Sequence, residues 1–173
     1  MQLQKSFRKI CLSIIIISML AMSIPIKTSA TDAIFSSYNN NIINDSAFRN
    51  NSSMTQAQIQ SFLVSKGSAL STYTINFDTY IGPGDTVNAR GMSASEIIYK
   101  VANWYNINPQ VILATLQKES SLVTSGTLTN LTYAMGYGCP ETSGCSASFA
   151  NFARQIDYAT YQFDFNFDGS EDK

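Results

Sequence analysis

The chain has 173 residues, of which 13% are charged and none is histidine, and its formal net charge at pH 7 is −1. This length suits one small domain with its own hydrophobic core. The absence of histidine excludes Ser-His-Asp and Cys-His catalysis, the absence of a basic patch excludes a nucleic-acid partner, and an enzyme here would depend on carboxylates.

The first thirty residues have the pattern of a secretory signal peptide. Lys5, Arg8 and Lys9 precede the apolar run 10–22, which is short for a membrane span, and residues 28–30 are the small Thr-Ser-Ala that a signal peptidase accepts. An uncleaved anchor is the alternative. Cleavage leaves seven basic and twelve acidic residues and no stable membrane span. We therefore predict a secreted or cell-wall-associated protein, acting as a monomer.

The start of the mature chain is rich in Asn and Ser, and residues 31–53 are expected to form an irregular lead-in. A first helix is predicted from Thr55 to Lys66. Thr55 and Gln58 have the spacing of a capping box, and Gly67 is placed to end the helix.

The next segment, residues 72–81, has the aromatic and β-branched content of an extended strand, and Gly-Pro-Gly-Asp at 82–85 predicts a turn. We divide the mature chain into a lead-in region, 31–92, and a helical domain, 93–173. The predicted fold class is mainly α.

Two closely spaced helices should open the helical domain. Ser93 and Glu96 have the spacing of a second capping box, which predicts a helix ending near Asn106. Asn108 followed by Pro109 predicts the start of the next, because the side chain caps the helix and the ring pre-sets φ. Helices joined by so short a link should pack as neighbours.

Glu119 is the candidate catalytic residue. On the helix that starts at Asn108, it lies at i+7 from Ile112, within about 20° around the axis, and about 40° from Leu116 and Val123. It is therefore expected to point into the apolar seam, where loss of water raises the pKa of a carboxyl toward the range of a general acid. The alternatives are a solvated Glu, a helix-end residue that extends out to solvent, or one half of a buried ion pair.

A glycine-containing loop from 126 to 144 should follow, and then a helix with apolar residues at core spacing over 149–163. Cys139 and Cys145 form a close pair that predicts a disulfide closing a tight surface loop. With two thiols and no histidine, no metal site and no cofactor are predicted.

The C-terminal tail imitates a calcium-binding loop, which would make the chain a calcium-dependent interaction module. The matching residues are Asp164, Asn166, Asp168, Gly169 and Asp172. Such a loop needs an acid at its twelfth position, which the pattern does not reach, so an acidic helix end is the favoured interpretation.

The segment INPQVILATLQKESSLV, followed by AMGYGCP and a helix rich in Phe and Tyr, resembles secreted lysozyme-like proteins of the soluble lytic transglycosylase type. The resemblance covers roughly 93–163, about half of the mature chain. It implies a lysozyme-like helical domain in shortened form. Where the commoner family loop has Gly-Leu-Met-Gln, this chain has Met-Gly-Tyr-Gly, so contacts of that Gln are not carried over.

The resemblance also implies a function, cleavage of peptidoglycan glycan strands. Family members deliver an acid in an E-S dipeptide, matched by Glu119 and Ser120, and a single Glu acts first as acid and then as base while an anhydro ring closes. The residues implied for substrate binding are Ser120, Tyr133, Met135, Gly136 and Tyr137. Trp104 and Tyr105 are expected to pack in the core.

Three other acids are the alternatives for a second catalytic group. Glu141, Asp157 and Asp164 are each expected to be solvated surface residues. Two other functions stay open, a hydrolysing muramidase or glucosaminidase and a non-catalytic module that binds cell-wall glycan on the same scaffold.

Overall fold

A computed structural model of the chain describes residues 42–169, and the predicted signal peptide, residues 1–30, lies outside this range. The described part is mainly α-helical and has one small sheet of two strands, which confirms the predicted fold class. None of the helices within 42–169 combines the length and the apolar character that crossing a membrane requires.

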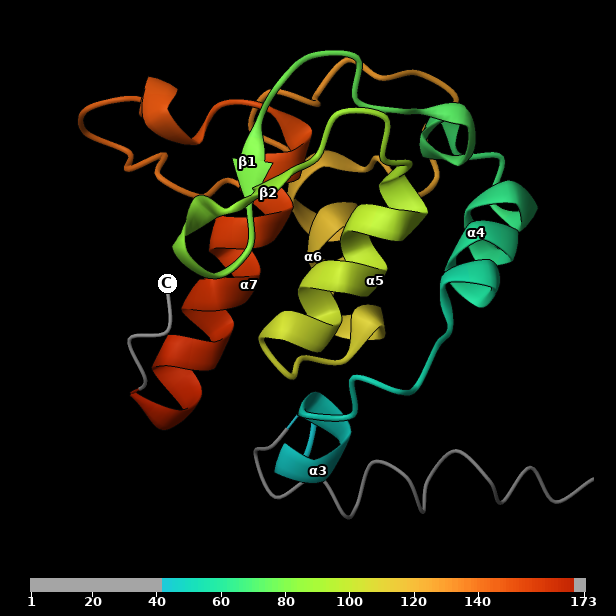
Figure 1. The fold of residues 1–173 in the computed structure, drawn as a ribbon, viewed down its shortest axis with the longest axis vertical. Helices are drawn as coiled ribbons and strands as arrows, with labels where there is room; N and C mark the ends of the chain where they lie inside the picture. The colour runs from blue at the N-terminus through green and yellow to red at the C-terminus, as the bar shows by residue number, and fades with distance from the viewer. Residues whose placement is uncertain (1–41, 170–173) are drawn as a thin grey trace, which may run out of the picture. The chain divides into compact units, whose positions relative to one another are not determined.

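Helices form about half of the described residues. Figure 1 shows α5 between α4 and α7 with α6 behind it. The α-helices are α3 (Asp45–Phe48), α4 (Gln56–Ser65), α5 (Ala94–Trp104), α6 (Pro109–Ser120) and α7 (Phe152–Asp168). Three short 3-10 turns, η1 (Ala69–Thr72), η2 (Pro83–Asp85) and η3 (Ala147–Phe149), lie in the connections. The strands β1 (Tyr80–Ile81) and β2 (Val87–Asn88) pair antiparallel, with Tyr80 opposite Asn88 and Ile81 opposite Val87.

The three helix starts predicted from capping residues are confirmed. Thr55 and Gln58 form both halves of a capping box at the start of α4. The Asn108 side chain accepts a hydrogen bond from the Gln110 amide at the start of α6. At α5 the Ser93 hydroxyl accepts a hydrogen bond from the Glu96 backbone amide, which is one half of the expected capping box. The other half is not assigned, and the Glu96 carboxylate lies 3.7 Å from the Lys100 ammonium group.

The hydrophobic core is built around α5, whose inward side chains are fully buried. Because α5 contacts α4, α6 and α7, one cluster joins all four helices. Its largest members on these helices are Ile59, Leu63, Ile97, Ile98, Val101, Ile112, Leu116, Phe152 and Ile156. Burial of each large aliphatic side chain contributes about 1.5–3 kcal/mol, so this cluster is the main source of stability. It also fixes the ends of α6 and α7 relative to each other.

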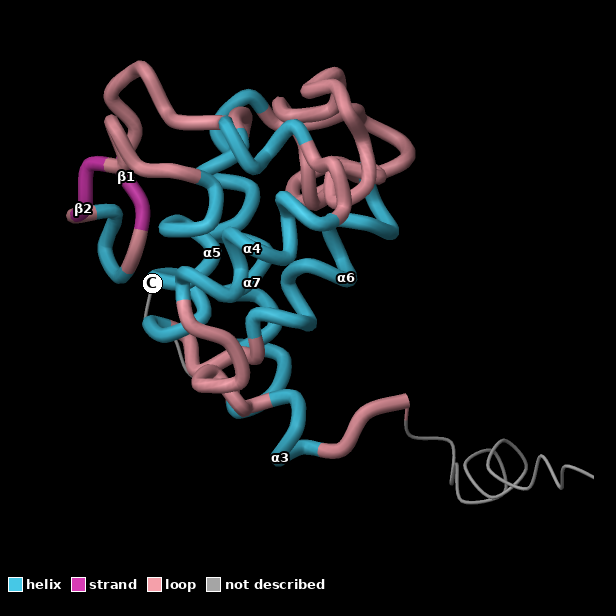
Figure 2. Tube along the Cα trace, turned by 90° about the vertical axis from the view of Figure 1, so that its right-hand side faces the viewer, coloured by secondary structure: helices cyan, strands magenta, loops and turns pink. Residues whose placement is uncertain are grey.

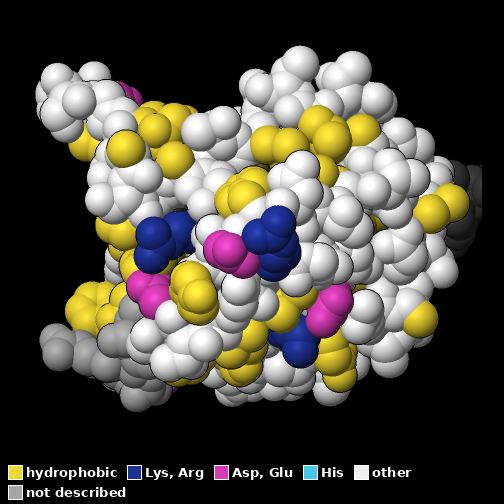
Figure 3. Space-filling model, turned by 45° about the horizontal axis from the view of Figure 1, so that its top comes forward, with side chains coloured by type: hydrophobic (Ala, Val, Ile, Leu, Met, Phe, Trp, Pro, Cys, Tyr) yellow, Lys and Arg dark blue, Asp and Glu magenta, His cyan; other side chains and the backbone are white. Residues whose placement is uncertain are grey.

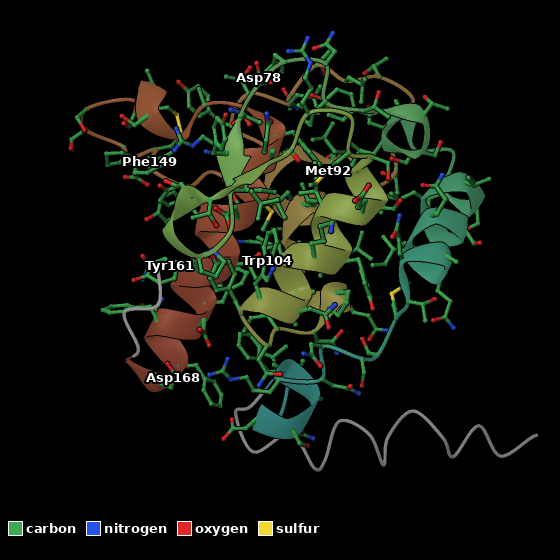
Figure 4. The ribbon with its side chains drawn as sticks, viewed as in Figure 1. Asp78, Met92, Trp104, Phe149, Tyr161 and Asp168 are labelled. Carbon is green, nitrogen blue, oxygen red and sulfur yellow. A yellow bond between two sulfur atoms is a disulfide. The ribbon has the colours of Figure 1, made fainter. Side chains whose placement is uncertain are left out.

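The predicted extended segment 72–81 is confirmed in part. Its first residue belongs to η1, but Thr74 forms an antiparallel bridge with Ser93, the Ile75 amide donates to the Met92 carbonyl at 3.0 Å, and the segment ends in β1. The predicted turn at 82–85 is confirmed as η2. Gly82 has φ 83°, and a Cβ there would stand 3.2 Å from the Trp104 ring. The hairpin therefore rests on Trp104, which Figure 4 shows between α5 and the hairpin, as expected for a packing residue.

The expected irregular lead-in is wrong for its last residues, because 45–48 form α3. Asn44 caps this short helix by accepting from the Ala47 amide at 2.8 Å. Asn108 then connects α3 to the start of α6, since its side chain donates to the Ala47 carbonyl and its amide to the Phe48 carbonyl, both at 2.8 Å. The contacts that order this segment lie about sixty residues away and are invisible in local composition.

In the described part of the acidic tail, residues 164–168 are the end of α7 and Gly169 is its C-cap. Asp164 and Asp168 lie in α7, and both pair with Arg49, whose guanidinium also lies 4.4 Å from the Phe167 ring. Asp168 stands at the end of α7 nearest α3 in Figure 4. Among residues 42–169 no group of three acidic, Cys or His side chains is placed to hold a metal ion. The predicted solvation of Asp164 is wrong, because this ion pair buries it.

Asp157 is also buried, which corrects the expectation that it is a surface residue. Asp157 is a residue of α7, its side chain is fully buried, and it accepts a hydrogen bond from the Tyr105 hydroxyl at 3.0 Å. Burial, and then the negative charge of Asp157, raise the pKa of Tyr105 far above its usual value. Asp157, on the apolar face of α7, therefore supplies the hydrogen-bond partner that the buried Tyr105 hydroxyl needs.

Candidate functional site

The candidate site is a surface pocket of about 320 Å³ between the end of α6, the loop after it and the second half of α7. Many of the loop segments of the described chain lie at the upper end of the helices in Figure 2, and others lie near α3. The residues that line the pocket are Thr115, Lys118, Glu119, Met135, Tyr137, Ala159, Gln162 and Phe163. Of these eight, Glu119 alone carries a carboxylate.

Glu119 lies on this pocket but is not buried as its helical position predicts. Its side chain is 35% exposed, and Oε1 lies 2.9 Å from the ammonium group of Lys118, which is 81% exposed. The helical projection fails because α6 ends at Ser120, with Ser121 left-handed at φ 59°. Val123 is thus in a loop, and the last-turn carboxylate extends past the core. The structure therefore matches the alternative of a helix-end residue that reaches solvent, and the ion pair with Lys118 is an exposed one, not the buried pair.

The second oxygen of Glu119 faces the glycine loop. Oε2 lies 3.5 Å from the place where a Cβ on Gly136 would stand, and Gly136 has φ 69°, a conformation that favours glycine. Met135 and Tyr137, on either side of it, line the pocket. The structure therefore brings together four residues predicted to share a site, Glu119 and the three loop residues 135–137.

Two other predicted site residues lie elsewhere. Ser120 is buried, and its hydroxyl donates to the Leu116 carbonyl at 2.8 Å, so it contacts neither the pocket nor Glu119. Tyr133 is half-buried outside the pocket lining, and its carbonyl accepts from the Gly136 amide at 3.0 Å. Both residues shape the local backbone, and neither prediction of substrate contact is supported by placement.

Tyr137 is held edge-on by its neighbours. Its ring centroid lies 4.9 Å from that of Phe149 and 5.7 Å from that of Tyr158. Burial, with a smaller contribution from Tyr161, raises the pKa of Tyr137. Phe149, expected in the last helix, instead lies in η3, because α7 begins at Phe152. The aromatic cluster places one ring of the loop against the pocket.

From the sequence, Gln155 faces the cleft only if the last helix crosses Glu119, and a role in holding the loop was not predicted. Its side chain is fully buried, and its Oε1 accepts from the amides of Met135 at 3.2 Å and Tyr137 at 3.0 Å. Its Nε2 donates to the carbonyls of Tyr137 at 2.9 Å and Phe149 at 2.8 Å. The sequence signal for this role is its position three residues after Phe152, on the apolar side of α7, where a polar side chain needs buried partners.

The predicted disulfide between Cys139 and Cys145 is present. The Ser146 amide donates to the Gly138 carbonyl at 2.8 Å, which closes the base of the loop. Glu141 at the tip is exposed, as expected. In Figure 4, Phe149 lies beside this loop.

Gly138 offers a direct test of how tightly the loop is packed. It has φ 68°, and a Cβ there would overlap the Phe149 ring. Gly144 has φ 73° but no atom near its Cβ position. Both Gly→Ala changes incur about 1–2 kcal/mol of left-handed strain, so Gly138→Ala should lower the free energy of urea unfolding by more than Gly144→Ala. Equal losses would show that Phe149 does not pack on this glycine.

A second polar cluster joins the η2 turn to α7. The Asp85 carboxylate accepts from the Tyr158 hydroxyl at 2.7 Å and from the Arg154 guanidinium at 3.2 Å. Burial, and then the hydrogen bond and charge of Asp85, raise the pKa of Tyr158 to about 12. This cluster fixes the hairpin on the side of α7 that also supports Tyr137.

The raised pKa of Tyr158 predicts alkaline sensitivity. A group whose pKa is higher in the folded than in the unfolded state stabilises the fold fully below its unfolded pKa, about 10, and loses that contribution as pH rises to about 12. In Tyr158→Phe the free energy of urea unfolding should fall less steeply between pH 10 and pH 12 than in the wild type. Parallel curves in that window would contradict the assignment, and pH 7–9 serves as the reference range.

On the face in Figure 3, Lys and Arg side chains lie beside Asp and Glu side chains. The ion pairs are Arg49 with Asp164 and Asp168, Arg90 with Asp78, Lys100 with Glu96, Lys118 with Glu119 and Arg154 with Asp85. This arrangement gives no polyanion-binding surface on the face in view.

Fold and site together define a small, mainly α protein with a single-carboxylate surface pocket under a glycine loop. The chain belongs to the family described as LasA, N-terminal domain, whose model matches residues 41–173, and this family is associated with secreted proteases. No curated protein and no solved structure matches the chain. The lysozyme-like resemblance is confirmed by none of these comparisons.

Proposed function

We propose that this chain is exported from the cytoplasm and cleaves the glycan strands of peptidoglycan, with Glu119 as the single acid and base. The observation that carries the proposal is that Glu119 Oε2 lies 3.5 Å from where a Cβ on Gly136 would stand, in a pocket edged by Tyr137 and Phe163. A carboxylate, a backbone without a side chain and aromatic edges suit a sugar ring, whose C–H faces pack on rings while its oxygens need polar partners.

The reaction needs little more than this set. Glu119 donates its proton to the glycosidic oxygen as the C1–O bond breaks, and the resulting carboxylate accepts the proton of the muramic acid 6-hydroxyl. That oxygen bonds to C1 and closes the anhydro ring, so no water is consumed. Two-carboxylate glycosidases place their acids about 5–5.5 Å or 6.5–9.5 Å apart, whereas the pocket lining here holds one acid.

Lys118 has a defined part in this proposal. It is strongly exposed and pairs with Oε1, so a sugar ring entering the pocket can displace it at little cost. The ring also removes water from the carboxyl, and desolvation favours the neutral form that donates the proton. Cleavage is therefore expected to depend on substrate occupying the pocket.

The experiment is incubation of the purified mature chain with purified cell walls. The proposal predicts that the walls bind the protein and that soluble glycan fragments accumulate with time. A protein that neither binds nor releases fragments contradicts it.

One observation favours a second candidate, a non-catalytic module that binds cell-wall glycan. The Glu119 carboxylate is ion-paired and open to water, and the family is an N-terminal domain by description. Such a module binds walls and releases nothing, so the same incubation distinguishes the two.

A further inference from the structure

We propose that Gln155 is a positioning residue that holds the backbone of residues 135–137 at a fixed distance from the Glu119 carboxylate. The inference rests on the proposed function for its consequence in catalysis, but its structural part stands on the hydrogen bonds of one side chain. Gln155 does not line the pocket beside Glu119, and its side chain is fully buried.

The loop has no regular secondary structure that would hold its position. Residues 121–146 form no helix or strand, so their backbone groups have no regular ladder of partners. Gln155 supplies two acceptor sites and two donor hydrogens, and all four are used on the backbone of Met135, Tyr137 and Phe149. A fully used buried amide has one arrangement, so it specifies the loop position.

The hydrogen bonds lie on both sides of Gly136, the loop glycine beside the acid. Gln155 binds the amide before Gly136 and both backbone groups of the residue after it, and Gly136 is the point where the loop meets Glu119 Oε2. Gln155 is on α7 and Glu119 on α6, and both helices are fixed to the common core. The distance between carboxylate and loop is therefore set by α7 through this amide.

Small shifts matter at such a distance. A displacement of about 1 Å in a reacting group can reduce a rate by about 10²-fold. Loss of the amide should leave the pocket residues present while the Tyr137 backbone moves relative to the carboxylate.

The test uses two variants and one control in the full mature chain. Gln155→Met keeps the approximate volume and removes all four hydrogen bonds. Gln155→Glu keeps an oxygen that can accept from the two amides and removes the donating NH₂ group, so it is the second variant if Gln155→Met fails to fold. Leu63→Ala, on the buried face of α4, is the control for general loss of stability. Hydrogen exchange is followed at the amides of Met135 and Tyr137.

We expect exchange at both amides to rise at least tenfold in Gln155→Met and less in Gln155→Glu, with kcat on soluble glycan strands falling in the same order. Leu63→Ala should keep kcat per folded molecule. Unchanged exchange at 135 and 137, or faster exchange with unchanged kcat, overturns the proposal. If the wild type proves to bind glycan without cleaving it, affinity for the same strands replaces kcat: a tenfold loss in Gln155→Met supports the positioning role, and equal affinity overturns it.

Discussion

Glu119→Gln should keep the fold and lose wall-cleaving activity by at least about 10²-fold, since general acid–base catalysis contributes about 10²–10⁴-fold. The amide cannot donate a proton to the glycosidic oxygen or take one from the 6-hydroxyl. Stability should be almost unchanged, because the side chain is partly exposed and its partner is the freely exposed Lys118. Fragment release from purified walls and Tm measure the two effects.

Glu141→Gln is the matched control, because it removes one charge from the exposed disulfide loop and should leave the rate unaltered. If the Glu119 variant released fragments as fast as the wild type, Glu119 would not be the catalytic group.

Arg49→Met should lower the free energy of unfolding by about 2–4 kcal/mol, far more than the loss of an exposed ion pair. The change leaves Asp164, which is buried, without its cation and removes the hydrogen bond that Arg49 donates to the Tyr105 carbonyl. Methionine keeps part of the packing against Phe167. The measurement is urea unfolding at neutral pH.

The matched control is Arg90→Met, which breaks an ion pair with Asp78 in which both side chains are more than half exposed. Solvent screening makes such a pair weak, so little change is expected. Similar losses in the two variants would show that the Arg49 cluster does not anchor α3 to α7.

The helices could be predicted because their signals are local. Thr55, Ser93 and Asn108 each precede an apolar repeat, and a capping side chain satisfies amides only two or three residues away. The loop disulfide was predictable for the same reason, since its cysteines are close in sequence.

The rest depends on contacts between distant segments. Asp157 was expected in water because the Tyr105 hydroxyl that binds it is 52 residues away. The role of Gln155 in holding the loop could not be predicted, because its partners are backbone groups of a loop whose path is not revealed by composition. Glu119 was placed too deep, because periodicity assumes a continuing helix and α6 ends one residue later.

Mass spectrometry of the fragments released from purified walls tests the central claim most directly. One carboxylic acid working alone, with the sugar's own hydroxyl as nucleophile, should leave muropeptides that end in 1,6-anhydromuramic acid. Fragments carrying ordinary reducing ends would mean that water is the nucleophile and would contradict the single-acid route.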